Sequence, residues 1–246
     1  RRPSGSGAPR AISTETADAR TIRSQMWIDP AGWPFVSAAV LVAVVLGWFF
    51  GWLGATPGLV LAVLFFLFFR DPEREVGLIP VTAVLSPADG RVMVAGDPTG
   101  ERTPTGAWRQ ITIFLSPLDV HVNRMPVAGR VTRVDYHPGR FLPAYKPEAG
   151  DLNEHTEVWI DHAGQTIVVR QIVGLLARRI VCRVVEGDVV EAGQRFGVMK
   201  FGSRMDVFVP PGTEILVARD DRVVAGVTRI ARLPTEVVFG TETHEP

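Results

Sequence analysis

A Gly-Ser pair, Gly202–Ser203, lies between two apolar runs in the stretch RFGVMKFGSRMDVFVPPG, residues 195–212. Gly-Ser is a common turn dipeptide, and most serines in turns do no chemistry. Here both neighbouring runs have the pattern of strands, and Gly202 can adopt a backbone conformation that a side chain would resist. If the peptide is strained and a base is near, the Ser203 hydroxyl can attack the unshielded Gly202 carbonyl. The pair therefore predicts either an ordinary turn or a bond that the chain cuts itself.

Self-cleavage at this bond would create a cofactor from the chain. The ester formed by Ser203 can lose its oxygen by β-elimination, and hydrolysis of the resulting dehydroalanine leaves a pyruvoyl group on the new amino terminus. A pyruvoyl carbonyl forms a Schiff base with a substrate amine and accepts the electrons left when carbon dioxide departs, as PLP does elsewhere. This interpretation predicts a covalent pyruvoyl group derived from Ser203 and a decarboxylase.

The same stretch supports a second interpretation. The residues EGDVVEAGQRFGVMKF, followed by VPPGTEI, resemble a biotinyl or lipoyl carrier domain. In such domains a lysine after a methionine lies at the tip of a hairpin, so Lys200 would carry the prosthetic group. A third class, a non-enzymatic β domain tethered to a membrane, requires neither cleavage nor modification.

Composition limits the remaining possibilities. The 246 residues are 46% hydrophobic, which excludes a wholly disordered chain. The 26 basic and 26 acidic residues balance, so nothing indicates nucleic acid as a partner. Cys182 is the single cysteine and cannot form an intrachain disulfide. We expect no metal, because the histidines are irregularly spaced and no HExxH or paired-cysteine motif occurs. No GxSxG motif supports an ordinary serine hydrolase.

An uncharged apolar segment runs from Trp33 to Phe69. It is longer than the roughly 18 residues that already suggest a membrane segment. Pro57 and Gly58 are expected to divide it into a first half that could span a bilayer and a shorter second half. A re-entrant or shallow helical hairpin fits those lengths. Arginines on both flanks predict that both ends, and the domain that follows, lie on the cytoplasmic side of the cell membrane.

The chain therefore divides into three predicted regions. Residues 1–25 are a polar tail, predicted to be disordered. Residues 26–70 form the membrane-associated helical hairpin, and residues 71–246 form one compact, mainly β (α+β) domain of short β-branched runs. The HAGQ sequence within this domain predicts a β-hairpin turn. Short helices are expected near residues 116–120 and 174–179.

Four motifs occur in order along the chain: FFRDPER (68–74), SPADGRV (86–92), FLSPLDVHVNRMPVAGRV (114–131) and FGSRMDVFVP (201–210). Together they resemble phosphatidylserine decarboxylase proenzymes of the shorter form, which has Gly-Ser at the cleavage site. The resemblance implies self-cleavage between Gly202 and Ser203 into a β chain ending at Gly202 and an α chain of residues 203–246. It implies conversion of phosphatidylserine to phosphatidylethanolamine and carbon dioxide at a membrane surface. A homodimer is expected on the same basis.

The resemblance also implies roles for particular residues. Asp89 matches an aspartate thought to orient a histidine base, although it could be an ordinary turn residue. His121 matches a histidine in or beside the active site, and an imidazole can act as acid or base near neutral pH. Longer relatives have a second histidine three positions later, where this chain has Arg124. Either His121 serves both reactions, or another histidine, His155 or His137, substitutes.

Cationic side chains would be needed for the lipid phosphate, because a guanidinium binds phosphate in a bidentate manner. Arg124, Arg178 and Arg179 are the candidates, with solvated surface arginines as the equal alternative. His155 and Tyr145 are further candidates for substrate binding. Tyr145 lies with Lys146 in a proline-flanked segment that could form a loop over the site.

Overall fold

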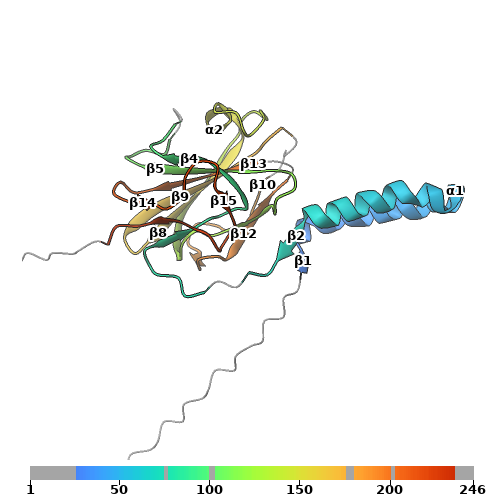
Figure 1. The fold of residues 1–246 in the computed structure, drawn as a ribbon, viewed down its shortest axis with the longest axis horizontal. Coiled ribbons are helices and arrows are strands. Elements are labelled where there is room, and N and C mark those ends of the chain that lie inside the picture. The colour runs from blue at the N-terminus through green and yellow to red at the C-terminus, as the bar shows by residue number, and fades with distance from the viewer. Residues whose placement is uncertain (1–25, 75–76, 100–102, 176–179, 201–202, 236–246) are drawn as a thin grey trace, which may run out of the picture.

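The computed structural model describes residues 26–74, 77–99, 103–175, 180–200 and 203–235. A long helical hairpin projects from a compact β domain, and the two arms of the hairpin lie side by side (Figure 1). The predicted mainly β fold, preceded by an apolar helical element, is confirmed. The predicted tail of residues 1–25 lies outside the described residues.

The β domain consists of one large sheet and two small ones. The large sheet has the order β11-β7-β8-β9-β13-β5-β4-β15, and the small sheets have the orders β10-β12-β6 and β14-β16-β3. All pairs are antiparallel. The strands of the domain are β3 (Ala83–Leu85), β4 (Gly90–Gly96), β5 (Arg109–Leu115), β6 (Val122–Arg124), β7 (Gly129–His137), β8 (His155–His162), β9 (Gln165–Ile172), β10 (Ile180–Cys182), β11 (Val189–Val190), β12 (Arg195–Met199), β13 (Ser203–Val209), β14 (Glu214–Ile215), β15 (Arg222–Val223) and β16 (Arg229–Arg232).

The core of the domain is formed by alternate residues of the central strands. Met205 and Val207 of β13 are fully buried beside Ile113 of β5 and Val169 of β9. Because neighbouring residues of a strand point to opposite faces, this pattern also fixes which face each polar residue occupies. All seven residues of β13 are buried, so the strand that begins with Ser203 lies in the interior of the domain.

The HAGQ turn joins β8 to β9 as predicted. Ala163 and Gly164 both have positive φ, 51° and 85°, which is the geometry of a tight turn between antiparallel strands. The prediction of a short helix at residues 116–120 is wrong. Asp119 accepts a hydrogen bond from the Ser116 amide at 2.8 Å, which closes a single turn before the chain extends into β6. A short helix instead occupies Ala149–Leu152 (α2). At residues 174–179, the described part shows no helix and the rest lies outside the described residues.

The apolar segment forms α1, Trp33–Phe68, in which Gly51 alone has a non-helical backbone with φ 67°. The chain therefore reverses at Gly51, not at Pro57–Gly58 as predicted. The error has a physical cause. Pro57 removes one helical hydrogen bond, but the Thr56 hydroxyl donates to the Leu53 carbonyl that would otherwise have lost its partner.

Small residues let the two arms of α1 approach closely. Ala39 and Ala43 of the first arm and Ala62 of the second are buried. At Gly58 a Cβ would lie 2.5 Å from the Ala43 nitrogen, so no larger residue fits there. Close packing through small residues is typical of helices that associate in lipid. The spacing of Ala39, Ala43 and Gly47, four residues apart, is a sequence signal for this contact.

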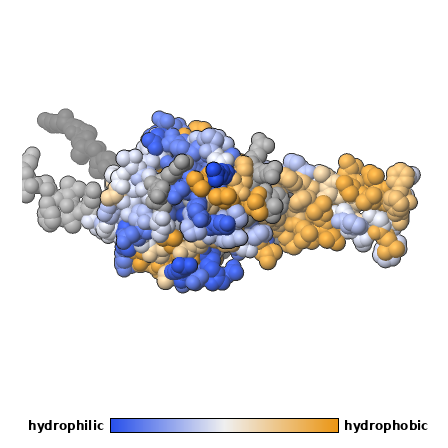
Figure 2. Space-filling view, turned by 90° about the horizontal axis from the view of Figure 1, so that it is seen from above, coloured by the Kyte–Doolittle hydropathy of each residue, from blue (hydrophilic) through white to orange (hydrophobic). Residues whose placement is uncertain are grey.

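The rest of the hairpin surface is apolar and exposed. Figure 2 shows this hydrophobic surface on the projecting hairpin, beside the more polar surface of the domain. By length and composition α1 could cross a membrane, with a mean hydropathy of 2.2. Reversal at Gly51 gives arms of about 18 and 17 residues, or about 27 and 26 Å. The expected short second half is thus wrong, because the arms are nearly equal. Trp48 and Trp52, 85% and 76% exposed, flank the tip.

The base of the hairpin is fixed to the domain by a small ladder and by ion pairs. Strands β1 (Met26–Ile28) and β2 (Arg70–Pro72) pair across the base, and a 3₁₀ helix, η1 (Pro30–Gly32), leads into α1. Asp71 of β2 binds Arg124 and Arg195 of the domain, and Asp29 binds Arg183 at 2.6 Å. Position and orientation of the hairpin are therefore set by charge pairs whose carboxylates, on Asp29 and Asp71, are buried.

Candidate active site

Ser203 is the first residue of β13, which lies between β5 and β9 in the large sheet. It pairs with Leu115 at the end of β5 and is fully buried. Among the described residues, its hydroxyl has no hydrogen-bond partner. A buried hydroxyl without a partner is costly and therefore uncommon. Gly202, the other half of the predicted cleavage site, lies outside the described residues.

The topology brings His121 to the same end of the sheet as Ser203. Leu115, the partner of Ser203, is followed by the turn at Ser116–Asp119 and then by His121. The His121 carbonyl accepts a hydrogen bond from Met199, the last residue of β12, at 3.2 Å. Only the short link 200–202 separates Met199 from Ser203, so the His121 carbonyl binds one end of the link that leads to Ser203.

The surroundings of His121 keep its ring neutral. Its Nδ1 lies 2.8 Å from the Asp119 carbonyl oxygen, which can only accept, so Nδ1 carries the proton and Nε2 the lone pair. The Phe68 ring packs on the imidazole with the ring centroids 4.2 Å apart. Burial lowers the pKa of His121 to about 4, against an opposing contribution from Asp119. A neutral imidazole with Nε2 unprotonated can act as a general base.

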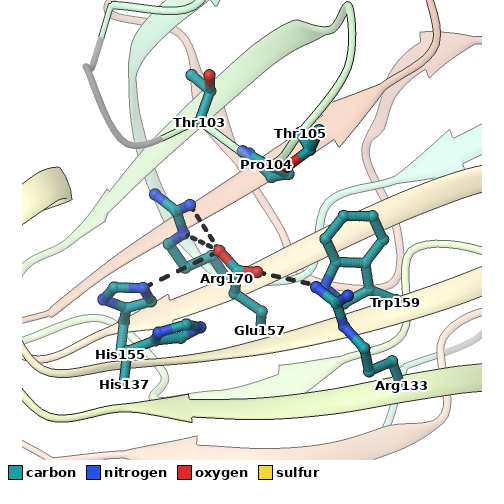
Figure 3. A pocket seen from close by; sticks show the side chains of 9 residues that line it. All are labelled: Thr103, Pro104, Thr105, Arg133, His137, His155, Glu157, Trp159 and Arg170. Carbon is teal, nitrogen blue, oxygen red and sulfur yellow. Dashed lines mark hydrogen bonds and ion pairs between the residues drawn. The ribbon is translucent and has the colours of Figure 1, made fainter.

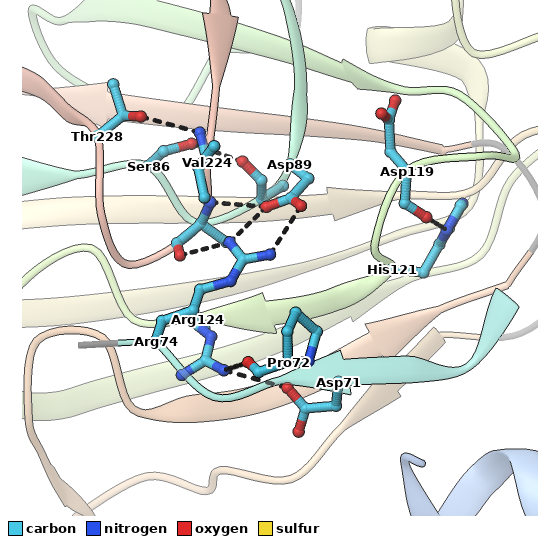
Figure 4. Close-up of polar contacts among 12 residues, drawn as sticks. Asp71, Pro72, Arg74, Ser86, Asp89, Asp119, His121, Arg124, Val224 and Thr228 are labelled. Atoms are coloured by element: carbon cyan, nitrogen blue, oxygen red, sulfur yellow. Dashed lines mark hydrogen bonds and ion pairs between the residues drawn. The ribbon is translucent and has the colours of Figure 1, made fainter. Parts of the chain in front are cut away.

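Asp89 lies between β3 and β4 and is bound by donors from two distant segments (Figure 4). Arg74 contacts both carboxylate oxygens, at 2.5 and 2.7 Å, and the Ala225 amide donates at 2.8 Å. The next residue must be glycine, because a Cβ at Gly90 would lie 2.1 Å from the Phe114 carbonyl oxygen. The negative charge of Asp89 acts through space to raise the pKa of His121, which favours the protonated imidazole. None of these contacts joins Asp89 to a histidine, so its predicted role in orienting a histidine stays a prediction.

Arg124 has structural partners in this fold. Its guanidinium donates to Asp71 and to the Pro72 carbonyl, both at 3.1 Å, and to the Gly193 carbonyl at 3.1 Å. The side chain is buried, and burial lowers its pKa. This arrangement favours attachment of the hairpin base over binding of a lipid phosphate. Arg178 and Arg179, the other phosphate candidates, lie outside the described residues.

His155 belongs to a different cluster, on strands β7, β8 and β9 (Figure 3). Its ring stacks on that of His137 with centroids 4.6 Å apart, and its Nε2 lies 4.0 Å from Glu157. These three side chains line a cavity of about 280 Å³ and are close enough to share a cation. However, Arg170 donates twice to Glu157, at 2.6 and 2.9 Å, so a fixed positive charge already occupies that carboxylate. Irregular sequence spacing hid this cluster, since it forms across paired strands.

Two further residues singled out in the sequence, Tyr145 and Lys200, contact aromatic rings. Tyr145 is exposed, and its ring meets Phe114 edge to face at a centroid distance of 6.2 Å. Phe114 neighbours Leu115 on β5, so its side chain points to the opposite face of the sheet from the one Leu115 occupies. The Lys200 ammonium lies over the rings of Phe35 and Phe69 at the hairpin base. That position differs from the hairpin tip that a carrier lysine requires.

Comparison with known proteins decides between the interpretations. The family model described as Phosphatidylserine decarboxylase matches residues 61–231. The chain belongs to the phosphatidylserine decarboxylase family. It is 48% identical over 210 residues to a phosphatidylserine decarboxylase proenzyme of Symbiobacterium thermophilum, covering 82% of this chain and 94% of that one. Proenzymes of Salinibacter ruber and Gluconacetobacter diazotrophicus are 45% and 46% identical, over 76% and 83% of this chain and 86% and 93% of theirs.

Membership of the phosphatidylserine decarboxylase family makes the chain an enzyme, and leaves the carrier and the non-enzymatic alternatives without support. The structure also adds residues to which the sequence had assigned no role. Phe68 and Arg74 belong to the FFRDPER motif, which was noticed only as part of the resemblance. Their contacts with His121 and Asp89 connect this motif to the two candidate site residues. The motif in the sequence was the signal that could have indicated these residues, but the sequence does not reveal which side chains they contact.

Proposed function

We propose that the chain is a proenzyme that cuts itself between Gly202 and Ser203 and then decarboxylates phosphatidylserine to phosphatidylethanolamine. The observation that carries the proposal is the buried, unpartnered hydroxyl of Ser203 at the start of a central strand, in a member of this family. A hydroxyl kept away from water and from competing donors is suited to attack a neighbouring peptide carbonyl.

The proposed self-cleavage passes through an ester and a dehydroalanine. Ser203 Oγ bonds to the Gly202 carbonyl carbon and loses its proton to the base, for which we propose His121. The C–N bond to Ser203 then breaks, and the amine gains that proton, which leaves an ester. Loss of the Cα proton of residue 203 expels Gly202 as a carboxylate. The resulting dehydroalanine tautomerises to an imine, and water replaces its nitrogen, which leaves as ammonia.

The pyruvoyl group formed in this way supplies an electrophilic carbonyl that binds a substrate amine and accepts electrons during loss of carbon dioxide. The residues described around Ser203 fit it, since Met205 and the adjoining core exclude water from that end of the strand. His121 holds a lone pair on Nε2 and can accept or return protons at the substrate. Asp89, held by Arg74 and Ala225, is proposed to favour the protonated form of His121 when it arises.

A lipid substrate is supported by an apolar hollow of about 350 Å³ beside this site. It lies between the second arm of α1 and the turn at Pro117–Leu118, with Phe68 and Arg70 in its lining. The Arg70 guanidinium donates to the Leu118 and Leu67 carbonyls, which places a positive charge beside apolar walls. We propose that the hairpin inserts into the membrane with the domain on the cytoplasmic side, and that the lipid reaches His121 along this hollow.

Intact-mass analysis of freshly synthesised protein tests the proposal. We expect two fragments, one ending at Gly202 and one beginning with a pyruvoyl group, and carbon dioxide release from phosphatidylserine vesicles. Ser203→Ala should remain one chain without activity. A wild-type chain that stays whole while releasing carbon dioxide would contradict the mechanism. An adduct on Lys200 would instead support the carrier alternative. A homodimer stays a prediction that analytical ultracentrifugation can test.

A further inference from the structure

Three buried polar atoms without partners occur together near Ser203. Among the described residues, such atoms are the Ser203 hydroxyl, Asn123 Nδ2, Gln171 Oε1, and two others on Gln165 and Thr213. Ser203, Asn123 and Gln171 are all fully buried. Buried polar groups are normally satisfied, so a cluster of exceptions requires an explanation, and a catalytic role is one of the few available.

The sheet register brings these residues close together. Gln171 of β9 lies opposite Met205 of β13, and Ser203 is two residues away on the same face of β13. Diagonal neighbours of this kind are within reach of a long side chain. Gln171 Nε2 donates to Asn123 Oδ1 at 2.8 Å, which ties β9 to β6. Asn123 follows His121 by two residues, so the amide pair connects the strand beside Ser203 to the segment that carries His121.

The fold makes room for this amide pair. Asn123 lies opposite Gly197 in the pairing of β6 with β12, and a Cβ at Gly197 would lie 2.6 Å from Gln171 Nε2. The hydrogen bond to Gln171 fixes the Asn123 amide, because the Oδ1 atom is occupied while Nδ2 is available. Exchange of nitrogen and oxygen in both amides would preserve the bond but move the unused donor from Asn123 to Gln171.

An available donor beside Ser203 matches what self-cleavage requires. When Ser203 Oγ attacks the preceding carbonyl, that oxygen becomes negatively charged, and fixed N–H donors stabilise such an oxyanion. We propose that Asn123 Nδ2 is an oxyanion donor for the self-cleavage of this chain. This inference rests on the proposed function. Asn123 transfers no proton. It donates one hydrogen bond that strengthens as the carbonyl oxygen gains charge.

Asn123→Asp tests the proposal because it retains the acceptor for Gln171 and the side-chain shape but removes the N–H donors. The precursor would be made by cell-free synthesis at pH 8, and the appearance of the two fragments followed by gel and mass. We expect the rate constant of cleavage to fall about 100-fold. At pH 5 the new carboxyl can regain a proton and donate, so cleavage should recover in part. His121 remains neutral there, since burial holds its pKa at about 4.

Gln165→Glu is the matched control, because Gln165 begins the same strand, also has an unpartnered amide oxygen, and donates to Pro234 far from Ser203. Its cleavage rate should equal that of the wild type. Asn123→Ala serves as a second variant if the aspartate prevents folding, as judged by melting temperature. Failure of the wild type to cleave overturns the proposed function itself. Normal wild-type cleavage with less than a threefold loss in folded Asn123 variants overturns only the oxyanion role, as does an equal loss in Gln165→Glu.

Discussion

Two of the buried histidines, His121 and His155, share one local arrangement but differ in their surroundings. In each, Nδ1 lies 2.8 Å from the carbonyl oxygen of the residue two positions earlier, Asp119 or Asn153. That carbonyl fixes the same tautomer in both rings. Burial lowers the pKa of both. By local criteria the two residues are equivalent candidates for a base.

Their wider surroundings separate them. His121 lies beside the link between β12 and β13, under the Phe68 ring from the hairpin. His155 lies two strands from β13, stacked on His137 and close to the Glu157–Arg170 ion pair. A buried ion pair of this kind is typical of a structural network and sets the orientation of the residues around it. A buried, neutral histidine is therefore a candidate base only where the tertiary structure places it beside the reacting bond.

The largest expected effect separates the two histidines directly. His121→Ala should lower the rates of both self-cleavage and decarboxylation about 1,000-fold, since a positioned general base contributes about 10²- to 10⁴-fold. His155→Ala should leave both rates within about fivefold of the wild type. Fragment appearance and carbon dioxide release from lipid vesicles measure the two reactions. The comparison fails if His155→Ala causes the greater loss.

The acidic neighbours of the two histidines provide the next test. Asp89→Ala leaves Arg74 without its carboxylate, and Glu157→Ala leaves Arg170 without one. Loss of one partner of a buried pair typically costs about 3–5 kcal/mol, so both variants should show a lower free energy of unfolding in urea. Folded Asp89→Ala should also cleave slowly, whereas folded Glu157→Ala should cleave normally. Equal cleavage rates in the two variants would argue against a catalytic contribution from Asp89.

Stability against pH should report the burial of His121. The folded chain keeps this ring neutral down to about pH 4, while the unfolded chain protonates it near 6.5. Between these values the unfolded state binds more protons, so the free energy of unfolding falls as the pH is lowered from 6.5 to 4. The loss amounts to about 3 kcal/mol from this group. Urea titrations at pH 7 and 4.5 should show a smaller loss in His121→Gln. A wild-type difference retained in His121→Gln would assign the effect to other groups.

The smallest expected effect concerns the rings that cover the two histidines. Phe68→Leu removes the aromatic contact with His121 and admits water, which should raise the pKa of His121 and shift the acid limb of the cleavage profile to higher pH. His137→Leu removes the ring stacked on His155 and should leave that profile unchanged. Rates measured from pH 4 to 8 provide the comparison, and an unshifted limb in Phe68→Leu would show that the hairpin does not tune the base.

Much of the fold followed from local patterns. Alternating β-branched runs and the HAGQ turn predicted a β domain correctly, because period-two burial and positive φ are local properties. The apolar run predicted the hairpin but not its turn. Pro57 does not mark the turn, because the Thr56 hydroxyl replaces the hydrogen bond that the missing amide would have made. The regular spacing of Ala and Gly indicates instead which residues of the two arms pack together.

The sequence by itself determined the family, the Gly202–Ser203 candidate and His121, because these depend on residue order and type. Only the tertiary structure decided that Arg124 binds Asp71, that His137 meets His155 across two strands, and that Asn123 and Gln171 meet near Ser203. The reason is physical: which groups share a buried site depends on strand register and on distances through the core. Both arise from packing between segments up to 154 residues apart.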